Sequence, residues 1–175
     1  MKLTPAMEKF VVHWGEMGSR WGVNRTVSQI YALLMLSAEP LNAEQIVDTL
    51  GVARSNVSNS IKELQVLGLV NLTHKLGDRR DHFEALKDCW DMLQVLADER
   101  KKREIDPTMV LLAQCVAEAK QDKNTPNYVT QQFEQMSQFM QTMSNWYEQM
   151  KKMDRKLLMR FFSLGSTLVG WLSKK

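Results

Sequence analysis

A row of small polar side chains and one lysine on a single helix face is the part of this sequence that could do chemistry. At 100° per residue, Ser55, Asn59 and Lys62 share one side of a helix expected from about residue 54 to residue 67. Asparagine pairs bidentately with adenine, serine bonds to either kind of base edge, and lysine reaches guanine or phosphate. No acid precedes Glu63 in this helix, whereas a merely solvated helix usually mixes acids and bases. The row is therefore typical of a helix that enters the major groove of DNA.

A basic loop follows this helix and could make a second contact with DNA. Residues 75–80 surround Gly77-Asp78, a turn signal, and are expected to form a loop whose tip carries three cations. Cations at such a tip can reach phosphates or the adjacent minor groove. The predicted DNA-binding residues of helix and loop together are Arg54, Ser55, Asn56, Ser58, Asn59, Lys62, Lys75, Arg79 and Arg80.

Two features must position the polar row. On the opposite side of the same helix, Val57, Ile61 and Leu64 recur at i, i+4 and i+7, which predicts burial. A shorter helix before it opens with the capping box Asn42–Gln45 and ends at Gly51. Two helices joined by a short turn that contains glycine form a helix-turn-helix.

A β-hairpin is expected after the second helix. Residues 69–74 alternate partly between β-branched and polar types, and residues 81–85 can return as the partner strand. The sequence therefore predicts a mainly α fold: a winged helix-turn-helix with a small β-hairpin wing, flanked by N- and C-terminal helices.

Residues 41–85 resemble the winged-helix core of MarR-type transcription regulators. Trp14–Gly18, Gly77–Ala85 and Arg103–Pro107 extend the likeness over residues 5–110 and make it similar to the GbsR-like branch. Members of that branch include repressors of glycine-betaine synthesis genes. The resemblance implies a homodimeric DNA-binding repressor or activator, whose N- and C-terminal helices are the dimerisation helices.

One position departs from that pattern. Such turns often place a serine cap where this chain has Ala53. We therefore expect the recognition helix to begin without a good cap, and its first turn to fray until DNA is bound.

The chain is expected to have three regions. Residues 1–39 form N-terminal helices that pack on the core and the dimer interface, and residues 40–86 form the DNA-binding region. Residues 87–175 form a helical region for dimerisation or effector binding. Within it, Asp106-Pro107 is expected to cap a helix that runs from about residue 107 to residue 120.

From residue 129 onward the apolar residues follow the seam of a coiled coil. The seam positions are Val129, Phe133, Met136, Met140, Met143, Tyr147 and Met150, and later Leu157, Phe161, Leu164, Leu168 and Trp171. Asp154 takes the seam position between these two series, so either one long helix has a polar notch or Asp154 caps a new helix. A two-fold partner would bury the stripe, and the dimer would set two recognition helices ~34 Å apart on DNA.

Composition limits the kinds of partner. The chain has 175 residues, 44% of them hydrophobic, and a formal net charge of +3. Residues 41–85 hold five cations against six acids, a net charge of −1, so DNA binding must depend on where the cations lie. The chain opens without an apolar signal core, and its longest apolar run is too short to span a bilayer. Together with the distant Cys89 and Cys115, this predicts a cytoplasmic protein without membrane contact.

Other chemistry finds little support in the sequence. His74 and His82 flank the loop, where phosphate contact or exposed strand positions are the preferred interpretation, and a metal site would need more ligands. Cys89 is expected to be buried and structural. No catalytic arrangement stands out, so we expect neither an enzyme nor a cofactor. The rival to DNA binding is a winged-helix module that binds another protein and not DNA.

Four tryptophans suggest an effector site. Trp14, Trp21, Trp90 and Trp146 all lie on predicted helices outside the DNA-binding region. Aromatic faces can hold a quaternary ammonium compound by cation–π attraction, and the GbsR-like branch includes choline-responsive members. Packing in the core and the dimer interface is the preferred interpretation of these residues.

Overall fold

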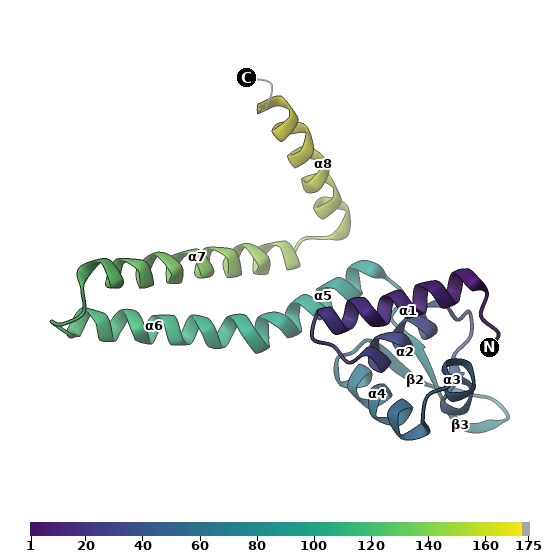
Figure 1. Ribbon diagram of the computed structural model, residues 1–175. Helices are drawn as coiled ribbons and strands as arrows, with labels where there is room; N and C mark the ends of the chain where they lie inside the picture. Colours follow the sequence, from purple (N-terminus) through teal and green to yellow (C-terminus); the bar gives the residue numbers. More distant parts are fainter. Residues whose placement is uncertain (173–175) are drawn as a thin grey trace. The chain divides into compact units, whose positions relative to one another are not determined.

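The structure is a computed structural model that describes residues 1–172, without the side chains of 162 and 165–172. It divides into two compact units, residues 1–99 and residues 100 onward. The first unit holds α1 (Pro5–Arg20), α2 (Arg25–Leu36), β1 (Leu41–Asn42), α3 (Ala43–Leu50), α4 (Arg54–Val66), β2 (Val70–Lys75), β3 (Asp78–Ala85) and nearly all of α5 (Cys89–Arg100) (Figure 1). The second unit holds η1 (Lys101–Ile105), α6 (Asp106–Gln121), α7 (Asn127–Lys151) and α8 (Arg155–Leu172). This is the predicted mainly α, winged helix-turn-helix fold.

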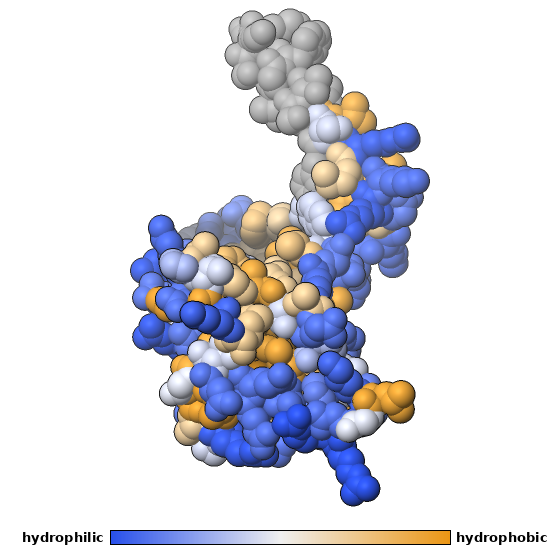
Figure 2. All heavy atoms as spheres, turned by 90° about the vertical axis from the view of Figure 1, so that its right-hand side faces the viewer, coloured by the Kyte–Doolittle hydropathy of each residue, from blue (hydrophilic) through white to orange (hydrophobic). Residues whose placement is uncertain are grey.

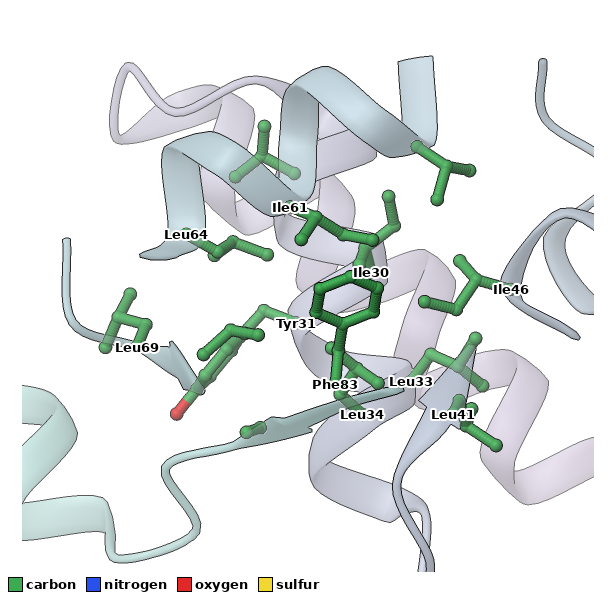
Figure 3. Packing of buried hydrophobic residues seen from close by; sticks show 14 residues of the cluster. Ile30, Tyr31, Leu33, Leu34, Leu41, Ile46, Ile61, Leu64, Leu69 and Phe83 are labelled. Carbon is green, nitrogen blue, oxygen red and sulfur yellow. The ribbon is translucent and has the colours of Figure 1, made fainter. Parts of the chain in front are cut away.

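The central helix of the first unit is α2, of whose twelve residues seven are buried. It packs against α1, α4 and β3. Figure 3 shows Phe83 of β3 in the middle of the cluster, between Ile61 of α4 and Leu33 and Leu34 of α2. Because α2 is apolar on several sides, it can support both the recognition helix and the sheet.

The helix-turn-helix forms as its caps predict. The Asn42 side chain accepts a hydrogen bond from the Gln45 amide at 3.0 Å, and the Gln45 side chain accepts one from the Asn42 amide at 2.9 Å. Gly51 ends α3 in the left-handed conformation, with φ 64°, which costs glycine little. These local signals place α3 and fix where α4 begins.

The three strands form an antiparallel sheet in the order β1-β3-β2. The expected loop over residues 75–80 is wrong, because β2 continues to Lys75 and β3 already begins at Asp78. Only Leu76 and Gly77 make the turn. Gly77 has φ 84°, and a two-residue hairpin needs positive φ, which glycine supplies.

The helix expected after Asp106-Pro107 is present as α6, but the expected cap is wrong, because Asp106 is itself helical and α6 has no side-chain cap. The backbone stays in the right-handed helical region at Arg100, Ile105 and Asp106. Proline has no N–H to donate and crowds the carbonyl four residues earlier, which normally ends or kinks a helix. Here the π-helical turn η1 precedes Pro107, and its wider winding gives the ring room without ending the helix.

Residues 127–172 form two helices, α7 and α8, and the interpretation that Asp154 caps the second of them is confirmed. The Asp154 side chain accepts a hydrogen bond from the Leu157 amide at 2.9 Å, so one long helix through this region is wrong. The later seam positions Leu168 and Trp171 lie outside the described side chains.

In the second unit, α6 and α7 lie side by side as an antiparallel hairpin (Figure 1). Lys120 of α6 forms an ion pair with Glu134 of α7 at 2.7 Å, and Lys101 of η1 forms one with Glu148, near the other end of α7, at 3.4 Å. Ser144 is the buried residue of α7. Of the predicted seam positions, Met136 and Met143 are exposed, whereas the other five are half-buried: Val129, Phe133, Met140, Tyr147 and Met150.

We predict that Gly18→Ala destabilises the first unit, because α1 and α2 approach closely there. A Cβ at Gly18 would lie 1.9 Å from Ser28 Oγ and 2.7 Å from Ser28 Cβ. Such overpacking costs about 1–3 kcal/mol, against a gain of about 1 kcal/mol in helix propensity. Urea unfolding measures the change. Glu16→Ala, at an exposed position of α1, is the control, and Ser28→Gly should restore part of the loss. A Gly18→Ala protein as stable as wild type contradicts the close approach.

We predict a loss of stability at high pH that depends on Tyr31. Its hydroxyl donates to the Leu86 carbonyl at 2.7 Å, and burial, with a smaller effect of Cys89, raises the pKa of Tyr31 to about 12. In the unfolded chain Tyr31 ionises near pH 10. The stability that the protonated Tyr31 hydroxyl contributes is therefore complete below pH 10 and is lost as pH rises towards 12.

Tyr31→Phe tests this contribution. The variant should be less stable by about 1 kcal/mol at pH 8, because the Leu86 carbonyl loses its donor. The difference from wild type should shrink above pH 10, as urea midpoints across the pH range would show. A difference that stays constant up to pH 11 would show that the phenol ionises alike in both states.

Candidate DNA-binding surface

The recognition helix α4 turns its polar row to solvent. The six residues of α4 that the sequence predicts to contact DNA are all exposed: Arg54, Ser55, Asn56, Ser58, Asn59 and Lys62. On the other side, Val57, Ile61 and Leu64 are at most 3% exposed and belong to the core cluster. The predicted burial of this apolar stripe is confirmed. Since Ser and Asn are short, a surface can come close to the helix backbone along this face.

Helix α4 begins without a side-chain cap, as the sequence predicts. Ala53 has the extended geometry of a cap residue, φ −63° and ψ 142°, but its methyl group cannot accept a hydrogen bond. The amides of the first turn therefore have no cap acceptor, and they can donate to water or to an anion such as a phosphate.

Arg80 is held by two carboxylates. Its Nε donates to Asp78 at 2.9 and 3.1 Å, and its Nη2 donates to Asp78 Oδ2 at 2.5 Å. Its Nη1 donates to Glu44 Oε2 at 3.0 Å. The other oxygen of Glu44 accepts from Arg54 Nη1 at 3.2 Å. One carboxylate on α3 thus bridges the start of α4 and the wing.

These contacts keep the network charged. Hydrogen bonds from Arg80 hold the pKa of Asp78 well below its usual range, and those from Arg80 and Arg54 lower the pKa of Glu44. The same partners raise the pKa of Arg80. At neutral pH, therefore, both acids are ionised and both arginines are occupied.

The remaining cations of the surface are differently placed. Lys62, Lys75 and Arg79 are exposed, and within the described chain none of them forms an ion pair with a protein carboxylate. Arg79 and Arg80 lie on β3, not at the loop tip as predicted, because the turn is only two residues long. The tip itself is Leu76, whose side chain is fully exposed, next to Lys75.

The two histidines of the hairpin differ. His74 is exposed at an irregularity in the pairing of β2 with β3. His82 is 4% exposed, so its expected exposed strand position is wrong. Its Nδ1 lies 2.9 Å from the Arg80 carbonyl oxygen, and its Nε2 lies 3.6 Å from Asp78 Oδ2. His82 is therefore buried against Arg80 and Asp78 of its own strand and is not placed to contact DNA.

A groove of about 480 Å³ lies between α4 and the wing. Its lining includes Glu44, Arg54, Lys62, Arg79 and Arg80. Figure 2 shows the side of the molecule that carries α3 and the tip of the hairpin, and hydrophilic residues prevail over its lower part. The polar row and the wing cations thus border one hollow with mixed charge.

Comparison with known proteins agrees with this geometry. Residues 21–81 match the MarR family. A crystal structure described as that of a transcriptional regulator is also similar, with a TM-score of 0.61 and 17% identity over 91% of this chain and 99% of that one. At that identity the likeness shows the fold alone. No curated protein sequence matches the chain.

Within residues 21–81, sequence reasoning missed the two acids that hold Arg80. Asp78 carried a signal, because residues i and i+2 of a strand point to the same side and can pair. Glu44 carried none that we can identify, since its contact with Arg80 joins residues 36 positions apart.

The four tryptophans are spread over the structure. Trp14 is half-buried against the core cluster, with its ring centroid 5.2 Å from that of Phe10. Trp21 is 55% exposed and Trp90 is half-buried, both in the first unit. Trp146, 45% exposed, belongs to the second unit. A quaternary ammonium effector held by these residues stays a prediction.

Two further expectations concern the rest of the chain. Cys89 is exposed, so its expected burial is wrong; it begins α5, where the stripe that packs on the core is Met92, Val95 and Leu96. Within residues 1–172, no cluster of three or more His, Cys, Asp or Glu side chains could hold a metal ion. No helix in the described part of the chain is both long and apolar enough to cross a membrane.

Proposed function

We propose that this protein is a sequence-specific transcriptional regulator that binds double-stranded operator DNA as a homodimer and represses the adjoining promoter. The observation that carries the proposal is the division of α4. Its buried stripe is fixed in the core, while its exposed face is a row of short hydrogen-bonding groups flanked by Arg54 and Lys62. Such groups can reach base edges in the major groove, and the cations can contact phosphates.

The wing supports the same proposal. In winged-helix proteins the recognition helix reads the bases while the hairpin reaches the flanking backbone or the minor groove. Here Lys75 and Arg79 are exposed on the hairpin and face no protein carboxylate among the described residues. The proposal also assigns the protein to the GbsR-like branch. It includes a small effector that changes the spacing between the two recognition helices of the dimer.

The first test replaces the polar row. A duplex selected by the protein from a random double-stranded pool is compared with a shuffled duplex of the same length. We expect the variant with Ser55, Asn56, Ser58, Asn59 and Lys62 all changed to Ala to lose at least about 100-fold in affinity for the selected duplex. The reason is that each lost base contact costs about 1–3 kcal/mol.

Two checks accompany that measurement. Circular dichroism and sedimentation must show that the variant keeps the helicity and the oligomeric state of wild type. Glu8→Ala with Lys9→Ala changes exposed residues of α1 and should bind like wild type. If wild type retains selected and shuffled duplexes equally, sequence-specific binding is refuted, and the surface would be left for a protein partner.

The proposed homodimer is supported by the apolar residues of α7 that α6 does not cover. Met136, Phe139, Met143 and Trp146 are between 45% and 65% exposed. At helical spacing they form one stripe along α7. Isolated exposed apolar residues are ordinary, but a stripe of this kind usually marks an interface.

We predict that Phe139→Glu weakens self-association by at least about tenfold, because a charge placed in an apolar interface loses its hydration. Sedimentation equilibrium gives the association constant. Gln131→Glu, which adds the same charge at an exposed position of α7 away from the stripe, should associate like wild type. Equal association of all three proteins would exclude this stripe from the dimer interface.

A further inference from the structure

The proposed DNA-binding surface carries its own anion. Glu44 is the second residue of α3 and its side chain is 51% exposed. It accepts from Arg54 at 3.2 Å with one oxygen and from Arg80 at 3.0 Å with the other. Arg54 lies at the start of α4 and Arg80 lies on the wing, so the two arginines belong to different elements of the proposed DNA-binding surface. A carboxylate in this position occupies two of the three guanidinium groups that border the groove, those of Arg54 and Arg80.

We propose that Glu44 is a specificity-determining residue, which restrains Arg54 and Arg80 from binding phosphates irrespective of DNA sequence. The proposal rests on the proposed function and adds a role for an acid on the DNA-facing side. Guanidinium forks match carboxylate and phosphate alike, so Glu44 is an internal competitor of the DNA backbone.

Asp78 and Glu44 accept hydrogen bonds from different nitrogens of the Arg80 guanidinium. Asp78 takes Nε and Nη2 of Arg80, and Glu44 takes Nη1. If Glu44 lost its charge, Asp78 would still orient Arg80, but Nη1 would be available to a phosphate. Arg54 would be released as well, because within the described chain its ion pair is with Glu44.

Magnitudes decide which kind of DNA this restraint affects most. Exposed ion pairs contribute about 0–1 kcal/mol, so a phosphate can displace Glu44 at a modest cost. Non-specific DNA is bound almost wholly through its phosphates, so its affinity is lowered by the full free energy of displacing Glu44. An operator also gains base contacts from α4, which can hold the helix in place while the bridges stay intact. Glu44 therefore lowers affinity for random DNA more than affinity for the operator.

The test is Glu44→Gln, which keeps the shape of the side chain and removes its charge. Binding to the selected duplex and to the shuffled duplex is measured over a series of salt concentrations. We expect affinity for the shuffled duplex to rise about tenfold and affinity for the selected duplex about threefold or less. The salt slope of the shuffled duplex should steepen by about one for each arginine that gains a phosphate contact, and so by about two when Arg54 and Arg80 are both released.

Asp48→Asn is the matched control. It makes the same change in charge on the same helix, at an exposed acid with no ion pair to the described cations. It should alter both duplexes by the same small factor, with unchanged slopes. A specificity ratio and slope in Glu44→Gln that match those of Asp48→Asn overturn the proposal. If wild type itself shows no preference for the selected duplex, the proposed function fails instead, and this role for Glu44 fails with it.

Discussion

The proposed DNA-binding surface depends on the packing of the apolar side of α4 against the core. The polar row of α4 is rich in Ser and Asn, which are poor helix formers, and the helix has no N-terminal side-chain cap. Its helicity must therefore come from tertiary contacts. Val57, Ile61 and Leu64 supply them, because burying each such side chain is worth about 1.5–3 kcal/mol. Phe83 of the wing packs in the same cluster, so one set of contacts fixes recognition helix and hairpin together.

The charges of this surface are arranged by position and not by number. Five cations and six acids share residues 41–85, which gives no bulk attraction to a polyanion. The structure separates the cations into two groups. Arg54 and Arg80 are occupied by Glu44 and Asp78, whereas Lys62, Lys75 and Arg79 have no such partner within the described chain. A protein built in this way gains little from phosphates alone, and its affinity must depend more on the bases that α4 can reach.

Sequence reasoning succeeded where the signal was local. The capping box at Asn42, the helix end at Gly51 and the missing cap at Ala53 each follow from one or two neighbouring residues. The buried stripe of α4 follows from helical periodicity. It failed where two local rules competed. Pro107 should end a helix, but a wider turn before it absorbs the ring, and Gly77 permits a tighter hairpin than the six-residue loop expected.

Contacts between distant segments were beyond sequence reasoning for a different reason. Glu44 reaches Arg80 only because α3 and β3 pack beside each other, and that depends on the whole core and not on a motif. His82 shows the same limit, since its burial follows from the register that pairs it with Asn42 and Thr73. Positions of this kind become visible only once the fold is known.

The second unit shows why an apolar pattern alone does not tell which surface covers it. Five positions of the predicted heptad seam of α7 are half-buried, yet the buried residue of this helix is Ser144, and its Glu134 forms an ion pair with Lys120 of α6. Small polar residues let two helices pack closely and pair their charges, but they bury little apolar area. The stripe around Phe139 and Met143 is left outside that contact, where water meets it at a cost of about 25 cal/mol per Å². A second copy of the chain, as proposed, would cover that stripe with an identical one, and the dimer would then have to bring two α4 helices onto one side of the DNA.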